Sequence, residues 1–368
     1  MLRNKETFLL NHFKIIFKQG FKITTKFNHE YYKYIPHKYY KYREVNEDNL
    51  RAIKEEYIWL STPDKFRDPL DSTVSFDVYK QKRRISKIIQ KEMPILVFEE
   101  LKKELTKKGV NPSVFNKMNL DDAIQWTKNY TFNNGKFKFG KIRGYLKNQG
   151  LAKRKSEEFE KKIRELTSES KCKDFYDNFM NAFSQLNIKI KQTYFIHSFA
   201  GSYDNPTLWE NYTDNDKGFC IEYDLSLLEE IGFDKFTKLY QMWPIIYKNK
   251  EDIDLSELIR LSIKQVLKQR DIFGEYLLGI KVAINVMSKQ TKYNYEDEWR
   301  LLIEKKKQKN NKFYFPFMSA IYLGINIKES DKKIIVDIAR EKKIKVYQRT
   351  LNRFVNGYEF VSVNLESD

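Results

Sequence analysis

Two kinds of sequence texture alternate along the chain, and this alternation most constrains its fold. Strand-like segments occur before residue 77 and again after residue 192, whereas lysine-rich helical runs such as KQKRRISKIIQKE and LAKRKSEEFEKKIRELTSES fill the middle. Strands that share a core must come together around whatever separates them in the chain. We therefore predict one α+β core formed by residues 1–77 and 193–368, with residues 78–192 as a basic helical insertion.

The N-terminal part is predicted to be a strand–helix–strand unit. Residues 38–45, KYYKYREV, are typical of a strand, and Asn46 can cap a short helix that carries Glu47 and Asp48 in its first turn. A second short strand, YIWLS, follows and is ended by Pro63.

The part after residue 192 predicts more strands than helices. Two helices are expected, at about 254–287 and at 330–343. Strands are predicted at QTYFIHSF, GFCIEYD, PIIYK, DEWRLLIEKK, KFYFPF, SAIYLGI, VYQRT and YEFVSV. Because strands outnumber strand–helix–strand repeats, the fold class is predicted as α+β with a mixed or largely antiparallel sheet.

The charge balance favours a polyanionic partner. The chain has 68 Lys and Arg against 50 Asp and Glu, a net charge of +18, and residues 78–192 hold 27 of the basic and 13 of the acidic residues. Nucleic acid is the partner that such an excess favours. The alternative is that a lysine-rich composition reflects AT-rich coding and carries no function.

One segment of the insertion, residues 129–150, alternates aromatic and basic residues around glycines. Such alternation can hold phosphates and stack bases. The alternative is a basic hairpin that packs Phe137 and Phe139 and leaves its lysines in solvent. The predicted nucleic-acid contacts are Lys136, Lys138, Lys141 and Arg143.

Several classes of protein are disfavoured by what the sequence lacks. Two cysteines are too few for a disulfide framework, which favours a reducing cytoplasm. In FLLNHFKIIF, polar residues interrupt the apolar runs before they reach the length of a membrane span, so no membrane association is expected. No paired histidines, CxxC, P-loop or dinucleotide-binding glycine motif is present, and no metal is expected.

Four segments, in this order, carry a family resemblance. They are YKYR at 40–43, STPDKFRDPLD at 61–71, HSFAGSYDNPTLWENYTDNDKGFCIEYD at 197–224, and YEDEWRLLI at 295–303. Together they resemble an uncharacterised bacterial family, domain-of-unknown-function family 2971. Arg67, His197 and Thr213 depart from the residues usual in that family, and the family name implies no activity.

A second resemblance implies chemistry. The order of an arginine on a first strand, a serine on a middle strand and Glu-x-Glu on a later strand resembles the ADP-ribosyltransferase fold. It implies that Arg43 holds the pyrophosphate of NAD, with Ser198, Glu296 and Glu298 as catalytic residues and NAD as substrate. Cleaving the nicotinamide–ribose bond passes through an oxocarbenium-like state, which a nearby carboxylate stabilises.

The glutamate pair is predicted to lie on one strand face. Strand alternation would put Glu296, Glu298 and Arg300 on the same side, and two carboxylates in one cleft should raise one pKa. Glu298 would then hold the ribose and Glu296 would activate the acceptor. The alternative is that the pair belongs to a structural ion-pair network with Arg300 and Arg43.

Other residues complete the predicted site. Tyr42, Trp209 and Tyr212 are expected at the cofactor, with Trp209 and Tyr212 three residues apart on one helix face, although a core role is equally open for them. Asp64, Asp68 and Asp71 follow a strand, and Asp68 and Asp71 are predicted to form a structural loop that orients a cation.

The leading hypothesis is an NAD-dependent ADP-ribosyl-type transferase, a bacterial defence or toxin enzyme that acts on nucleic acid or a nucleic-acid-associated protein. The first alternative is a metal-dependent nuclease or phosphodiesterase, in which Asp68, Asp71, Glu296 and Glu298 would bind Mg²⁺. The second is a non-enzymatic nucleic-acid-binding adaptor of phage defence, built on the insertion.

Overall fold

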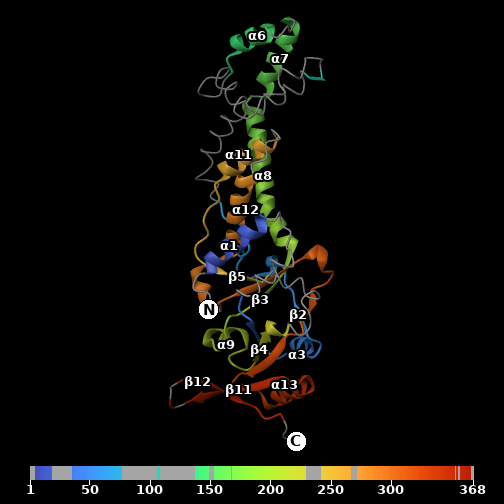
Figure 1. Cartoon of the computed structure of the whole chain (residues 1–368), viewed down its shortest axis with the longest axis vertical. Coiled ribbons are helices and arrows are strands. Elements are labelled where there is room, and N and C mark those ends of the chain that lie inside the picture. The colour runs from blue at the N-terminus through green and yellow to red at the C-terminus, as the bar shows by residue number, and fades with distance from the viewer. Residues whose placement is uncertain are drawn as a thin grey trace. The chain divides into compact units, whose positions relative to one another are not determined.

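The computed structural model separates the chain into two compact units (Figure 1). Unit 1 comprises Met1–Thr73, Lys189–Lys250 and Ala283–Asp368, and unit 2 comprises Val74–Ile188 and Glu251–Val282. Within them, the structure describes residues 5–18, 35–76, 106–107, 137–148, 153–166, 168–228, 242–266, 272–352, 354 and 357–365.

A five-stranded sheet forms the larger half of unit 1. Its strands, in spatial order, are β1 (Lys38–Arg43), β4 (Phe219–Asp224), β10 (Met318–Leu323), β11 (Lys345–Asn352) and β12 (Gly357–Ser362). Neighbours pair antiparallel except β10 and β11, which pair parallel. The helix α13 (Glu329–Lys342) makes this crossover and lies beside β11 (Figure 1).

A second, three-stranded antiparallel sheet lies next to β1. Its order is β3 (Tyr194–Phe199), β8 (Trp299–Glu304) and β5 (Met242–Pro244). Backbone bonds between Tyr40 and Ala200, of 3.0 and 2.7 Å, join the end of β3 to β1. This junction holds the faces of β1 and β3 next to each other.

Two short strand pairs complete unit 1. The strand β2 (Tyr57–Trp59) pairs antiparallel with β9 (Lys312–Tyr314), and β6 (Ile246–Tyr247) pairs parallel with β7 (Ser288–Lys289). Ser61 and Ile196 exchange two backbone bonds of 2.8 Å, which fasten the loop after β2 to β3.

The expected N-terminal unit is confirmed in its details. In α3 (Glu47–Lys54), the side chain of Asn46 accepts a hydrogen bond from the backbone of Asn49, as an N-cap residue does. Ile53 lies on the buried face of this helix. The second strand ends at Trp59, before the predicted Pro63, which instead begins the 3₁₀ helix η1 (Pro63–Lys65).

Aromatic side chains fill the space between the two sheets. Tyr39 of β1 packs at 5.7 Å, between ring centroids, against both Phe199 of β3 and Trp299 of β8. Phe8 of the N-terminal helix α1 (Lys5–Lys18) reaches the same cluster at Trp299. These rings make the sheet junction dry and fix the backbone of β1 and β3.

Unit 2 is helical in its described part. Its helices are α6 (Phe139–Asn148), α7 (Lys153–Leu166), most of α8 (Glu169–Thr193), α11 (Leu255–Val266) and most of α12 (Ile272–Val286). The hairpin alternative for residues 129–150 is wrong from Phe139 onward, because this stretch forms α6 and Ile142 is buried. Single glycines in the segment did not prevent a helix that packs one apolar face.

The fold class is confirmed at the level of a mixed α+β protein with a largely antiparallel sheet. Its finer likeness to the ADP-ribosyltransferase fold stays a prediction. In the described part of the chain, every helix is too short or too polar to span a bilayer.

Candidate active site

A pocket of about 590 Å³ opens where β1, β3 and the loop after β2 meet. The helix α9 (Pro206–Tyr212) and the segment from Lys289 to Arg300 complete its wall. The pocket is lined by the predicted site residues Tyr42, Arg43, Asp68, Asp71, Ser198, Tyr212, Glu296 and Glu298. Residues far apart in the sequence are therefore brought to one cavity.

The three aspartates of the loop after β2 have separate roles. Asp64 is exposed in η1. Asp68 accepts a bond of 2.9 Å from the backbone of Leu70 and so forms a local turn. Asp71 is the buried member of the three, with 4% of its surface exposed, and it pairs with Arg300 of β8.

Arg300 is the centre of the buried polar network. Its two terminal nitrogens each lie 2.7 Å from a carboxylate oxygen of Asp71, a bidentate pair. Its Nε lies 2.7 Å from Oε1 of Glu298, and its Nη1 lies 2.9 Å from the hydroxyl of Ser72. One fully buried guanidinium thus joins the loop to β8.

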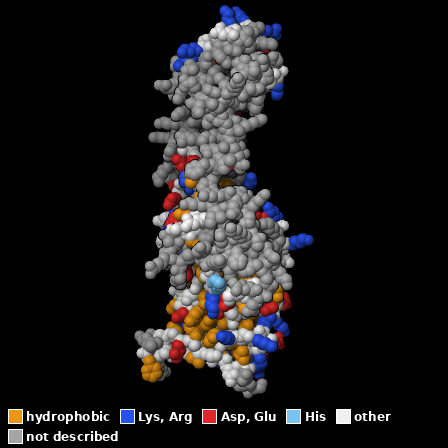
Figure 2. All heavy atoms as spheres, viewed as in Figure 1, with side chains coloured by type: hydrophobic (Ala, Val, Ile, Leu, Met, Phe, Trp, Pro, Cys, Tyr) orange, Lys and Arg blue, Asp and Glu red, His pale blue; other side chains and the backbone are white. Residues whose placement is uncertain are grey.

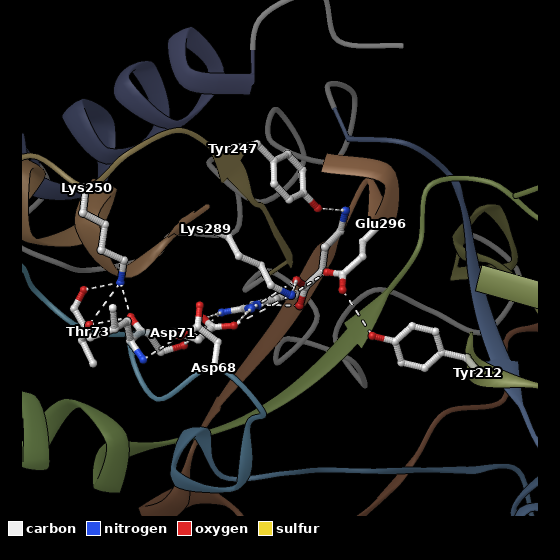
Figure 3. A network of polar contacts seen from close by, with 12 residues as sticks. Asp68, Asp71, Thr73, Tyr212, Tyr247, Lys250, Lys289 and Glu296 are labelled. Atoms are coloured by element: carbon white, nitrogen blue, oxygen red, sulfur yellow. Dashed lines mark hydrogen bonds and ion pairs between the residues drawn. The ribbon is translucent and has the colours of Figure 1, made fainter. Parts of the chain in front are cut away.

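Lys289 links the two glutamates. Its Nζ lies 2.5 Å from Oε2 of Glu296 and 3.1 Å from Oε2 of Glu298. Tyr212 of α9 donates to the other oxygen of Glu296 at 3.2 Å. Figure 3 shows Lys289 and Tyr212 reaching Glu296 from different sides. We call Asp71, Glu296, Glu298, Lys289 and Arg300 the carboxylate network.

The network shifts the pKa values of the two glutamates in opposite directions. Burial alone would raise the pKa of the Glu298 carboxyl, but Arg300 and Lys289 outweigh it and hold that pKa well below its ordinary value. Burial and then the charge of Glu298 raise the pKa of the Glu296 carboxyl, which Lys289 and Tyr212 only partly offset. The predicted rise of one pKa therefore falls on Glu296.

The strand position predicted for Glu296 is wrong. Glu296 ends the 3₁₀ helix η5 (Thr291–Glu296), Asp297 has a left-handed backbone with φ of 42°, and β8 begins only at Trp299. The pair meets because Lys289 bridges it. Asn205, which caps α9, also donates to the carbonyl of Tyr295 at 2.5 Å and so helps hold η5.

A second part of the pocket wall carries uncompensated positive charge. Lys41 and Arg43 alternate with Tyr42 on β1 and therefore share one strand face. Lys41 donates to the backbone carbonyl of Ser198 at 2.7 Å. Neither has a carboxylate hydrogen-bond partner among the described residues. We call Lys41 and Arg43 the cationic wall. The cation that the aspartate loop orients is Arg300, which pairs with Asp71.

Burial makes the cationic wall electrostatically strained. Burial lowers the pKa of Lys41 to about 7, Arg43 acts in the same direction, and Glu298 and Glu296 offset only part. Burial likewise lowers the pKa of the Arg43 guanidinium. An anion in the pocket would relieve both effects.

Two residues of β3 also line the pocket. Ser198 hydrogen-bonds to Glu298, which helps to lower the pKa of that carboxyl after Arg300 and Lys289. His197 has its Nδ1 2.6 Å from the carbonyl oxygen of Trp59, so Nδ1 carries the proton. Its Nε2 is buried and has no hydrogen-bond partner among the residues that the structure describes, which leaves an acceptor in the wall.

The three aromatic residues predicted at the cofactor lie in different environments. Tyr212 lies at the pocket with 43% of its surface exposed. Tyr42 lines the pocket, but its hydroxyl donates to the carbonyl of Ser202 at 2.9 Å. Trp209 is fully buried and packs edge-to-face against Tyr42, outside the pocket lining. Trp209 is therefore a core residue and does not line the pocket.

The predicted nucleic-acid residues lie in unit 2, where Lys and Arg side chains gather over α6 and α7 (Figure 2). Lys138 precedes α6, and Lys141 and Arg143 are exposed on that helix. Arg143 pairs with Glu160 of α7 at 2.5 Å. Lys136 lies outside the described residues.

Sequence reasoning missed Lys289 and Lys41. Nothing in SKQTKYNYEDE distinguishes Lys289 from neighbouring lysines, because its role depends on the turn that follows it. Lys41 had a usable signal: strand alternation in KYYKYR puts it on the same face as Arg43.

The carboxylates of the site are already paired with cations. Among the residues that the structure describes, no group of three or more His, Cys, Asp or Glu could hold a metal ion. The site thus defines a two-sheet α+β protein with a pocket that joins a carboxylate network to a cationic wall.

Comparison with known families finds a match over part of the chain. The model of the family described as protein of unknown function (DUF2971) matches residues 208–301, which confirms the family that the motifs indicated. The matched segment begins in α9 and ends in β8, and so includes Tyr212, Lys289 and both glutamates. A comparison with curated proteins and one with solved structures found no match.

Proposed function

We propose that the chain is an NAD-using transferase of the ADP-ribosyl type and that this pocket is its active site. The observation that carries the proposal is that one pocket holds both Arg43, which has no carboxylate partner among the described residues, and two glutamates of opposed pKa shifts. The cavity volume is within the range of small-molecule sites.

Each residue has a role in the proposed reaction. Arg43 would bind the diphosphate of NAD. As the bond between ribose C1′ and the nicotinamide nitrogen breaks, its electron pair leaves with nicotinamide, and the ionised Glu298 stabilises the positive ribose. The acceptor then bonds to C1′ and gives its proton to Glu296, whose raised pKa suits a base.

The metal-dependent alternative is less well supported by the geometry. Arg300 already neutralises Asp71 and Glu298, and Lys289 contacts both glutamates. A divalent cation would have to displace these buried cations to reach its ligands.

The acceptor that we propose is nucleic acid or a protein bound to it, in a bacterial defence or toxin role. The net charge of +18 supports this acceptor class. Stimulation of NAD turnover by RNA or DNA that declines steeply with salt would support it. Equal turnover with and without nucleic acid at every salt concentration would contradict it.

The test is release of nicotinamide from NAD by the purified protein, with and without RNA, DNA or cell lysate. Glu298→Gln should lower the rate about a hundredfold or more, because a charge-stabilising group is lost. The matched control is Glu329→Gln, which neutralises an exposed glutamate of α13 and should leave the rate unchanged.

Thermal melts establish that each variant is folded. If Glu298→Gln does not fold, Glu296→Gln replaces it, since Glu296 does not contact Arg300 in the network. Absence of nicotinamide release by wild type in every condition, or full release by a folded Glu298→Gln protein, would overturn the proposed function.

A further inference from the structure

Lys41 is a half-buried cation that no carboxylate among the described residues contacts directly. Its Nζ donates to the carbonyl oxygen of Ser198, a neutral acceptor, at 2.7 Å. It lines the pocket beside Arg43, which likewise has no carboxylate partner among the described residues. Uncompensated cations within a fold are costly, so such a pair indicates that a ligand completes the site.

The same wall has a second unsatisfied group. His197 of β3 is 2% exposed, and its Nε2 has no hydrogen-bond partner within the described ranges. The charges of Lys41 and Arg43 act on it, after burial, to lower the pKa of its imidazole well below the ordinary value. Three neighbouring polar side chains therefore leave bonding capacity unused at one place in the pocket.

We propose that Lys41 and Arg43 form an anion subsite for the diphosphate diester of a nucleotide ligand, and that Lys41 takes up a proton when this ligand binds. The inference rests on the proposed function only for the class of ligand. It does not require that the ligand be cleaved.

The groups that face Lys41 determine this proton uptake. Arg43 on β1 disfavours the positive charge of Lys41, and the neutral His197 on β3 does not stabilise it. Cys220 on β4 is neutral at ordinary pH because burial raises the pKa of its thiol. Glu298 and Glu296 favour the charge but are bonded to Lys289. With its pKa lowered to about 7, the free amine is largely neutral in mildly alkaline solution, and a bound anion would restore its proton.

The experiment is calorimetric titration of the full-length protein with ADP-ribose at about pH 8, in buffers of different ionisation enthalpy. Both phosphates of ADP-ribose are esterified, so its own charge does not change near neutral pH. It also has no nicotinamide bond to break. Wild type should bind with uptake of about one proton, and with much less uptake at about pH 6.

Two substitutions separate charge from proton exchange. Lys41→Met should weaken binding about ten- to a hundredfold, since a charge-assisted hydrogen bond is lost. Lys41→Arg should bind within about threefold of wild type but take up no proton, because arginine stays charged. Lys333→Met, which removes an exposed lysine of α13, should change neither quantity.

The inference is overturned if wild type does not bind ADP-ribose, if folded Lys41→Met binds as wild type does, or if Lys41→Arg takes up the same proton. Its fate is separable from that of the proposed function. Binding with Lys41-dependent proton uptake but without nicotinamide release would retain the subsite and refute NAD cleavage. Nicotinamide release with no change in ADP-ribose binding on substitution of Lys41 would do the reverse.

Discussion

The carboxylate network and the cationic wall line one pocket, yet they differ in how their charges are balanced. In the network, Arg300 and Lys289 lie within 3.1 Å of carboxylate oxygens, and every member except the partly exposed Lys289 is buried. In the wall, the only hydrogen-bond partner of Lys41 in the described part of the chain is a backbone carbonyl. A charge that the fold itself compensates stabilises the fold, whereas one left uncompensated is retained at the expense of stability for a ligand.

The largest effect expected from this difference follows loss of Arg300. Arg300→Met leaves Asp71 and Glu298 buried without their shared partner and should reduce the free energy of unfolding by about 3–5 kcal/mol. Denaturant unfolding measures this. Arg340→Met, which breaks the exposed pair with Asp337, is the matched control and should cost about 1 kcal/mol or less. Equal costs for the two variants would break the comparison.

The two glutamates should respond oppositely to neutralisation. Glu298→Gln removes a carboxylate whose pKa is lowered by Arg300 and Lys289 and should destabilise the protein at neutral pH by about 2–4 kcal/mol. Glu296→Gln removes a carboxylate whose pKa burial has raised, and should cost less than about 1 kcal/mol. Unfolding at neutral pH compares them, and a larger loss for Glu296→Gln would contradict the assigned directions.

The pH dependence of stability should identify Lys41. Its pKa is about 7 in the folded chain and near 10.5 in the unfolded chain, so the unfolded chain binds the extra proton between these values. The stability of wild type relative to Lys41→Met should therefore rise as the pH increases from about 7 toward 10. Unfolding curves of both proteins across this range test it. A constant difference would show that Lys41 is not strained.

The smallest effect is expected at Tyr212. Tyr212→Phe removes the hydrogen bond to Glu296 and should cost about 1 kcal/mol or less, because the tyrosine is half exposed. Since this hydrogen bond lowers the pKa of the Glu296 carboxyl, that pKa should rise further in the variant. Titration of the Glu296 carboxyl by NMR measures the shift, and a fall in the pKa would contradict the network.

The sequence predicted those features of the fold that depend on local chemistry. Asn46 caps its helix, Pro63 begins a 3₁₀ helix, and GFCIEYD forms β4, because cap, ring and strand propensity act within a few residues. The pairing of β10 with β11 in parallel could not be predicted in the same way, since it depends on where α13 crosses the sheet.

The site was predictable where one strand face or a motif order fixed it. Arg43, Ser198 and Glu298 line one pocket, as their order implied. Lys289 could not be predicted, because its contacts depend on η5 and on the left-handed Asp297. For the same reason Glu296 reached the site from a 3₁₀ helix and not from the predicted strand. Trp209 was ambiguous because core and ligand aromatics have the same sequence pattern.

The most direct test compares two arginines of the same pocket. The account predicts that Arg43→Met leaves the free energy of unfolding unchanged or raises it by up to about 1 kcal/mol, while Arg300→Met loses several. Denaturant unfolding of both variants beside wild type gives the two values. A loss from Arg43→Met comparable to that from Arg300→Met would show that the fold itself compensates the cationic wall, and would contradict its assignment to a ligand.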